Sequence, residues 1–402
     1  MGSGWRLAWR NLHRNRLRTR ISLAAVAFST AVLVICYAMA SGMMEQMSRS
    51  IVDLGFGEVQ VHATEYMVAR SIHETVQGAP EILSRAREHG VSAAPRAFGP
   101  ALLSMNEHAA GGQIWGVDPA AERELGELPK HLLRGAFLGE GNHRRRVVLG
   151  AKIARTLGAD IGSRVAIIVG AVDGSVSTDM YEVEGILKPV TEMIDGTAVI
   201  MRADDFGEMF ANGGGVHEIA LSSHGRLSPE AVAALVGGVS RGQDVRTWRK
   251  LLPAAAGAVD MVGGSTAIVG MIFLFAAALG VLNTMLMASF ERIPEFGVIR
   301  ALGATPGRIV RDVAREAFLL GLVGTVVGAA FGGVIAALAQ HYGINLGSVS
   351  MSGVEMSVWR PKLSLAAIVV PIAAMWVAAL GASLYPAWKA GGLNPIQAMN
   401  HI

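Results

Sequence analysis

The chain has little charge and almost no cysteine. Only 17% of its 402 residues are charged and 51% are hydrophobic, whereas an ordinary soluble domain has about 25% charged residues. This composition excludes a disordered chain and favours a membrane protein. The single cysteine, Cys36, excludes a disulfide framework or a cysteine metal cluster within the chain.

The sequence also lacks motifs of catalysis and nucleotide binding. It contains no HExxH zinc motif and no GxxxxGK[ST] phosphate loop. Its acidic residues are scattered without metal-ligand spacing. We therefore expect no catalytic, cofactor-binding or metal-binding residues on this chain.

Four long runs without charge are present. They hold 24, 30, 24 and 26 residues, and a membrane-spanning helix needs roughly 20 mostly apolar residues. They predict spans near 21–42, 266–289, 317–339 and 364–385. The first run is longer than the apolar part of a secretory signal, about 7–15 residues, so we expect an uncleaved span. The predicted fold class is a four-span α-helical membrane protein with a large domain inserted between spans 1 and 2.

Arginine and lysine are distributed unevenly beside these spans. Residues 1–20 carry six Arg and no acid, and the 290–316 loop carries five Arg. The short loop 340–363 has only Arg360 and Lys362. Because positive residues are retained on the cytoplasmic side, the pattern places both termini, including the tail 386–402, in the cytoplasm. The inserted domain then lies outside it.

The first 20 residues form a predicted amphipathic helix. Trp5, Trp9 and Leu12 share one helical face, while arginines follow one another every four residues on another. Such a helix suits the cytoplasmic membrane interface, with Trp at the headgroups and Arg towards anionic lipid. A plain positive anchor for span 1 is the alternative.

Residues 43–262 are predicted to form a mixed α/β domain. Short β-branched or alternating segments predict strands, and a Ser-Pro pair at 228–229 predicts the start of a helix. The predicted strands are 58–62, 113–117, 146–149, 165–169, 180–186, 197–201 and 218–221, and the predicted helices are 80–89, 151–157 and 229–239.

Two features of the membrane part stand out. Gly324, Gly328 and Gly332 are spaced four apart in span 3, which lets helices approach closely; they serve either simple packing or sliding of one helix against another. The spans contain no Asp, Glu, Lys, Arg or His, which argues against a proton- or ion-coupled transporter.

The 290–316 loop is predicted to be a short helix, a sharp turn and a second helix that enters span 3. Gly303 ends the first helix, and Thr305 caps the second. The first helix is charged, which suits contact with another protein or, alternatively, a solvated face. The charged residues proposed for such a contact are Glu291, Arg292, Glu295 and Arg300.

Three segments carry a family resemblance. Residues 283–304 (NTMLMASFERIPEFGVIRALGA), the closing YPA at 385–387 with NPIQAM at 394–399, and WRNL at 9–12 resemble MacB/FtsX-type permeases of ABC transporters. Within that family, the middle domain is similar to the lipoprotein-releasing LolC/LolE permeases. The similar segments there are GVDP at 116–119, 126–135 ending in HLLRG, and VVLG at 147–150.

The resemblance implies a location and partners. It implies a multi-pass protein of the cell inner membrane with a two-lobed periplasmic core domain. The permease would work with a second copy or a sister permease and with two ATPase subunits. These subunits bind ATP and magnesium and dock on the first part of the 290–316 loop. This chain, without a phosphate loop, would itself not be an enzyme.

The resemblance also implies a function, the extraction of lipoproteins from the outer leaflet for a periplasmic carrier. We expect acyl chains to enter between span 1 of one copy and span 2 of another, along a stripe of Val32, Ile35, Met39 and Met43. Packing against span 2, or contact with bulk lipid, is the alternative for this stripe. Signalling to a cell-wall hydrolase, export of another lipid or peptide, and a membrane-anchored enzyme remain alternative functions. The sequence names neither the cargo nor the choice between homodimer and heterodimer.

Overall fold

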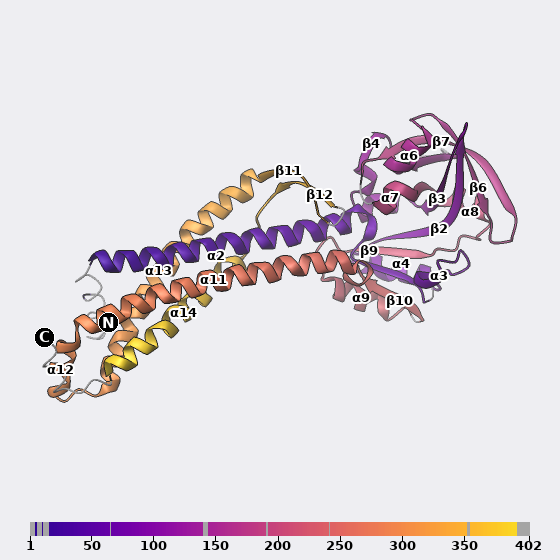
Figure 1. Ribbon diagram of the computed structural model, residues 1–402. Coiled ribbons are helices and arrows are strands. Elements are labelled where there is room, and N and C mark those ends of the chain that lie inside the picture. The colour runs from indigo at the N-terminus through magenta and orange to yellow at the C-terminus, as the bar shows by residue number, and fades with distance from the viewer. Residues whose placement is uncertain are drawn as a thin grey trace. The chain divides into compact units, whose positions relative to one another are not determined.

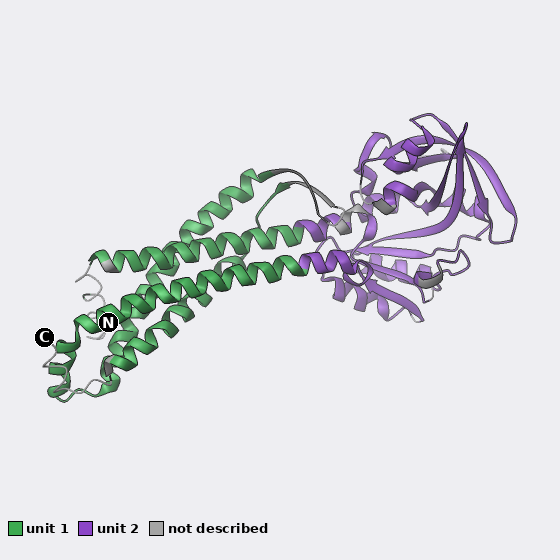
Figure 2. Cartoon of the chain, viewed as in Figure 1, with its two compact units in different colours: residues 1–45, 260–347, 357–402 green, residues 46–259, 348–356 purple. Residues whose placement is uncertain are grey.

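The computed structural model describes residues 5, 10, 16–64, 66–139, 144–189, 192–240, 242–351 and 354–391. It divides into two compact units, shown in different colours in Figure 2. We call residues 1–45, 260–347 and 357–402 the membrane unit, and residues 46–259 and 348–356 the α/β unit.

Four long helices dominate the membrane unit (Figure 1). They are α2 (Arg16–Ile51), α11 (Pro253–Glu291), α13 (Pro306–Tyr342) and α14 (Leu365–Gly391). Each is long and apolar enough to cross a membrane. Together with the inserted α/β domain they confirm the predicted fold class. All four helices extend beyond the apolar runs, because the helical conformation continues into the polar residues that flank each run. The limits of the membrane spans within these helices stay a prediction.

Short elements connect these helices. Helix α12 (Ile293–Ala301) lies between α11 and α13, and the strands β11 (Ile344–Met351) and β12 (Val354–Trp359) pair between α13 and α14. The predicted interface helix over 1–20 falls mostly outside the described residues. Of its face, Trp5 is described, and its ring centroid lies 5.4 Å from that of Phe318 on α13.

The glycines of α13 lie against α2. A Cβ atom built on Gly324 would lie 2.7 Å from the Cγ1 atom of Val26, and one on Gly332 would lie 2.6 Å from the carbonyl oxygen of Ala31. A Cβ atom on Gly328 would collide with the backbone of Ala27. The absence of side chains on this stripe therefore permits the close approach of the two helices.

The α/β unit is built on a ten-stranded mixed sheet, in the order β10-β1-β9-β2-β3-β8-β5-β7-β4, with β6 pairing both β2 and β7. The strands are β1 (Val59–Ala63), β2 (Ser92–Met105), β3 (His108–Val117), β4 (Leu132–Gly135), β5 (Arg146–Leu149), β6 (Arg164–Gly170), β7 (Val176–Leu187), β8 (Ala198–Arg202), β9 (Glu218–Ser222) and β10 (Gln243–Thr247).

Short helices accompany the sheet and join its strands. They are η1 (Val52–Phe56), α3 (Tyr66–Ala69), α4 (Ala79–Glu88), α5 (Pro119–Leu125), η2 (Leu128–Lys130), α6 (Ala151–Leu157), α7 (Glu192–Thr197), α8 (Ala203–Phe210), α9 (Pro229–Gly237) and α10 (Trp248–Leu251).

The sheet has two halves that share β2. Strands β10, β1, β9 and the start of β2 form one half, whose apolar side chains pack with those of α4 and α9. The end of β2 continues through β3, β8, β5, β7 and β6 back to β2, which closes a ring around a second core. The first half is built from both ends of the insert and the second from its middle, so the unit has two parts, as expected for the two-lobed domain that the family resemblance implies.

Candidate functional site

Helix α12 lies at one end of the helices of the membrane unit (Figure 1). It ends at Ala301, and the chain reverses at Gly303, whose φ of 90° favours glycine. Helix α13 then begins at Pro306, directly after Thr305. The short helix and its turn thus have the form that the sequence predicts for the 290–316 loop.

The inner side of α12 is held to α13 by charge and by apolar packing. The Nε atom of Arg292 lies 3.2 Å from an oxygen of Glu295, and its Nη1 atom lies 3.1 Å from Glu316 at the start of the apolar part of α13. The Glu316 side chain is only 8% exposed. Phe296, under the Arg292 guanidinium, belongs to a buried cluster with Val313 and other residues of α13 and α14. These contacts join α12 to the third span.

The outer side of α12 combines charge with exposed apolar side chains. Glu291, the last residue of α11, is exposed, and Glu295 is partly exposed. Arg300 is also partly exposed, but it follows the buried Phe296 by four residues and so lies towards the inner side. Leu302 is 84% exposed, and Val298 and Ile299 are exposed as well. An apolar centre with a charged rim is the usual anatomy of a protein–protein interface. Sequence reasoning named the charged residues of this helix but missed its exposed apolar residues and the buried Glu316.

The stripe of Val32, Ile35, Met39 and Met43 lies on α2, and all four side chains are partly buried. The segment before α14 contacts the end of this stripe, because the Nε1–H group of Trp359 donates to the carbonyl oxygen of Met39 at 3.1 Å. Within one chain, the side chains of this stripe are therefore neither fully buried nor fully exposed.

A buried cluster of charges lies in the α/β unit, outside any predicted site. Arg96 is 1% exposed and donates from Nε and Nη2 to the two oxygens of Glu122, at 2.6 and 2.8 Å. Its Nη1 atom donates to Glu218 at 2.8 Å and to the carbonyl oxygen of Gly55. Burial lowers the pKa of Arg96, but the charges of both carboxylates outweigh it and raise the pKa above its usual value. The arginine thus joins β2 to α5, β9 and η1.

His62 extends this cluster. Its Nε2 atom lies 3.0 Å from the Gln60 side-chain oxygen and 3.8 Å from Glu218. Gln60 is oriented by a hydrogen bond from its Nε2 atom to the carbonyl oxygen of Phe56, so its oxygen is the atom that faces His62. The Nδ1 atom of His62 lies 3.3 Å from the carbonyl oxygen of His217. Both ring nitrogens of His62 therefore face oxygen acceptors.

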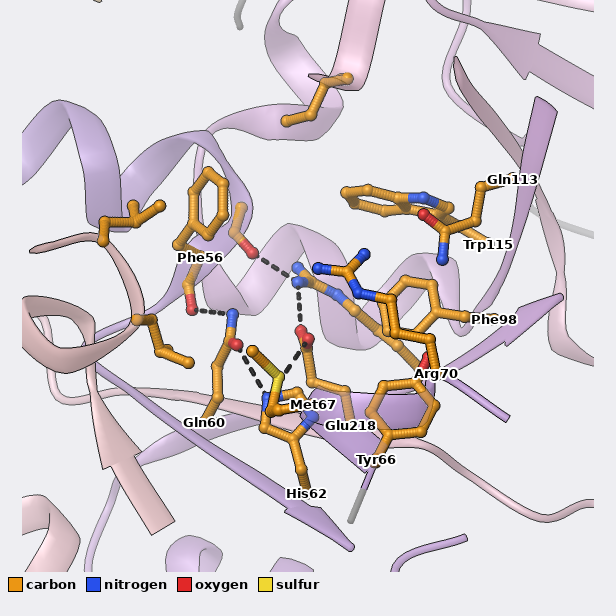
Figure 3. A pocket seen from close by; sticks show the side chains of 15 residues that line it. Phe56, Gln60, His62, Tyr66, Met67, Arg70, Phe98, Gln113, Trp115 and Glu218 are labelled. Carbon is orange, nitrogen blue, oxygen red and sulfur yellow. Dashed lines mark hydrogen bonds and ion pairs between the residues drawn. The ribbon is translucent and has the colours of Figure 1, made fainter. Parts of the chain in front are cut away.

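These charges border a pocket of about 100 Å³ (Figure 3). The Arg96–Glu218 pair, Gln60 and His62 line it together with apolar side chains and the cation of Arg70. A water molecule needs on the order of 10–15 Å³ of such space, so the pocket is large enough for several waters or a small chemical group.

His217 stabilises the region beside this pocket. Its Nδ1 atom accepts a hydrogen bond from the N–H group of Phe98 at 2.9 Å, which leaves Nε2 to donate to the carbonyl oxygen of Ile72 at 2.9 Å. Burial lowers the pKa of His217, so the ring is neutral near pH 7. Tyr66 stacks on it with ring centroids 5.4 Å apart. This histidine is a structural group of the core.

No group of three or more His, Cys, Asp and Glu residues within the described parts of the chain is placed to hold a metal ion. The features present are long apolar helices, an inserted α/β domain and a short helix with an exposed mixed surface. They define the class of membrane proteins that carry a large inserted α/β domain between long apolar helices.

Comparison with known protein families identifies the family to which this chain belongs. The MacB-like periplasmic core domain matches residues 19–239, and the FtsX-like permease C-terminal domain matches residues 267–395. The chain belongs to this family of MacB/FtsX-type ABC transporter permeases, as its sequence motifs predicted.

Individual relatives are distant. The lipoprotein-releasing system transmembrane protein LolC of Xylella fastidiosa is 21% identical over 96% of this chain and 95% of its own length. LolC of Neisseria meningitidis is 20% identical over 78% of this chain and 76% of its own. The macrolide export ATP-binding/permease protein MacB of Chromobacterium violaceum is 27% identical over 43% of this chain and 25% of its own length.

A solved structure is also similar to part of the chain. It is the periplasmic region of MacB from Actinobacillus actinomycetemcomitans, which is 10% identical, with a TM-score of 0.37, over 52% of this chain and 97% of that one.

Proposed function

We propose that this permease extracts lipoproteins from the outer leaflet of the inner membrane for transfer towards the outer membrane. The observation that carries the proposal is the similarity to lipoprotein-releasing LolC proteins over almost the whole length of both chains. The uncharged spans support it, since each CH₂ group removed from water contributes roughly 0.8 kcal/mol and such a surface suits acyl chains.

In this proposal a separate ABC ATPase, in two copies, binds ATP and magnesium. It docks on the outer side of α12, where Glu291 and Glu295 accompany exposed apolar side chains, and Arg300 belongs to the same helix. Because Arg292 contacts Glu316, movement of α12 is transmitted to α13. A second copy of the chain or a sister permease completes the transporter, and a periplasmic carrier accepts the cargo.

The proposed topology has both termini in the cytoplasm and the α/β unit in the periplasm. The arginine-rich segments before span 1 and around α12 support it. In a Cys36→Ser background, a cysteine replacing exposed Ser175 is expected to react with a membrane-impermeant thiol reagent added to spheroplasts. One replacing exposed Gly307 is expected to react only after permeabilisation. The opposite labelling pattern would refute this topology.

The proposed substrate path follows the stripe on α2, between this helix and α11 of the partner permease. A photo-crosslinker at Met39 is expected to capture lipoprotein in spheroplasts before ATP-driven release, and to lose it when release proceeds. The measurement is gel analysis of the crosslinked, acylated product.

Phe331 supplies the control for this experiment. It lies on α13, outside the proposed path, and is 65% exposed, so a crosslinker there should capture bulk lipid regardless of ATP. Capture at Met39 of the permease's own helices alone, with and without ATP, would contradict the substrate path and favour a signalling role. Capture of another lipid or a peptide would favour export of that substrate.

A further inference from the structure

The pocket of the α/β unit is lined by the two segments that adjoin the long helices. Gly55 and Phe56 belong to η1, which directly follows α2, and Leu251 and Leu252 directly precede α11. A ligand in this pocket would therefore contact the segment that follows α2 and the segment that precedes α11.

The charged groups around the pocket pair with one another, with the exception of one arginine. Arg96 is bound by the carboxylates of Glu122 and Glu218, and His62 faces oxygen acceptors at both ring nitrogens. Arg70 adds a further positive charge to the pocket wall, and none of the described residues forms an ion pair with it.

The backbone at Arg70 has an unusual conformation. Its φ of 46° lies in the left-handed region, which non-glycine residues rarely adopt. Such strain is found most often at functional positions, where the surrounding structure maintains it. Here the conformation accompanies an exposed guanidinium on the wall of the pocket.

A second, independent feature of the pocket is an unused hydrogen-bond donor. Trp115 is only 8% exposed, and its Nε1–H group has no hydrogen-bond partner among the described residues. A buried donor without a partner costs about 1–3 kcal/mol, so a native structure gains by placing an acceptor there. Figure 3 shows Trp115, Gln113 and Arg70 on one side of the pocket, facing Gln60 and His62 on the other.

We propose that this pocket binds the anionic head of a small amphipathic ligand, a carboxylate or phosphate attached to an apolar group. Arg70 pairs with the anion, and the Trp115 indole and the Gln113 amide donate hydrogen bonds to it. The apolar part contacts Phe56, Leu251 and other apolar residues of the lining. A cationic ligand does not fit, because the Glu218 oxygens already face Arg96 and His62.

Calorimetry with the full chain in phosphatidylcholine nanodiscs tests this proposal. Butyl phosphate is expected to bind saturably, whereas inorganic phosphate should bind more weakly and 1-butanol not at all. Arg70→Met should weaken butyl phosphate binding about 10- to 100-fold, because a charge-assisted hydrogen bond is lost. The thermal unfolding temperature should not change, since the side chain is exposed.

Arg164→Met is the matched control, because Arg164 is an exposed arginine of the same unit that does not line the pocket. It should bind like the unmodified chain, while Gln113→Leu should show an intermediate affinity. Equal binding by Arg70→Met and Arg164→Met, equal affinity for inorganic and butyl phosphate, or no saturable binding of butyl phosphate would each overturn the proposal.

Nanodiscs that contain phosphatidylglycerol distinguish the two sources of such a head group. If a lipid headgroup is the ligand, these discs should inhibit butyl phosphate binding, and Arg70→Met should remove the inhibition. If a free amphiphile is the ligand, both types of disc should give the same affinity. The measurement requires neither an ATPase nor a cargo, so its result is separate from that of the transport proposal.

Discussion

Replacing Arg96 with methionine is expected to lower the free energy of unfolding of the α/β unit by about 3–5 kcal/mol, because the substitution leaves buried carboxylates without their cation. Glu122 and Glu218 are 2% and 6% exposed, and both depend on this guanidinium. The measurement is thermal or denaturant unfolding of the purified full chain, followed by the tryptophan fluorescence of its domain.

Arg134→Met is the matched control for this substitution. Arg134 pairs with Asp160 at 2.9 Å, but both side chains are more than 60% exposed, so its loss should cost no more than about 1 kcal/mol. Adding Glu122→Gln and Glu218→Gln to Arg96→Met should restore part of the stability, because the unpaired charges are removed as well. Similar losses for the two arginine variants would contradict the role of Arg96.

Sequence reasoning predicted the membrane part and most of the α/β unit because their signals are local. An uncharged run is visible in the sequence whatever it packs against. Seven strands and three helices of the insert also correspond to predicted segments, since each has a local pattern. Strands β2, β4 and β10 were not predicted, and neither were the short helices α3, α5, α7, α8 and α10.

Strand β2 was missed because it contains residues that usually interrupt strands, Pro95, Gly99 and Pro100. The prolines are tolerated because β2 changes partners along its length. Pairing with β9 covers Ser92–Arg96, pairing with β3 begins at Arg96, and pairing with β6 begins only at Leu102. Each proline thus has a neighbouring strand on one side only.

Two glycines in the strands are explained by packing against helix α8, which the sequence alone does not show. The rings of Phe206 and Phe210 on α8 stack with centroids 4.2 Å apart. A Cβ atom on Gly99 would collide with Phe210, and one on Gly116 would collide with Phe206. The helix therefore rests on the bare backbone of two strands, which is a tertiary contact between distant parts of the chain.

The charged cluster was unpredictable for the same reason. Gly55, Arg96, Glu122 and Glu218 come from four elements and have no characteristic spacing. Arg96 and Glu218 meet only because β2 and β9 pair in register at these two residues. A sequence pattern identifies a site when neighbouring residues form it, and this cluster depends instead on the topology of the sheet.

Glu295→Lys is expected to reduce transport at least about tenfold. The Glu295 side chain is 42% exposed on the outer side of α12 and lies beside Arg292. Reversing its charge changes the rim of the proposed ATPase-docking surface, and a reversed contact at a close charge pair costs several kcal/mol. The measurements are the amount of ATPase that co-purifies with the permease and the ATP-driven release of lipoprotein from proteoliposomes.

Asp312→Lys provides the control, because it makes the same change of charge at a similar exposure, 37%, on α13 rather than on α12. It should leave both measurements close to those of the unmodified chain. Loss of co-purification by Glu295→Lys alone would support direct docking of the ATPase on α12. Normal assembly with loss of release would instead support transmission through Arg292 and Glu316 to α13. Equal behaviour of the two variants would show that Glu295 is not part of the coupling surface.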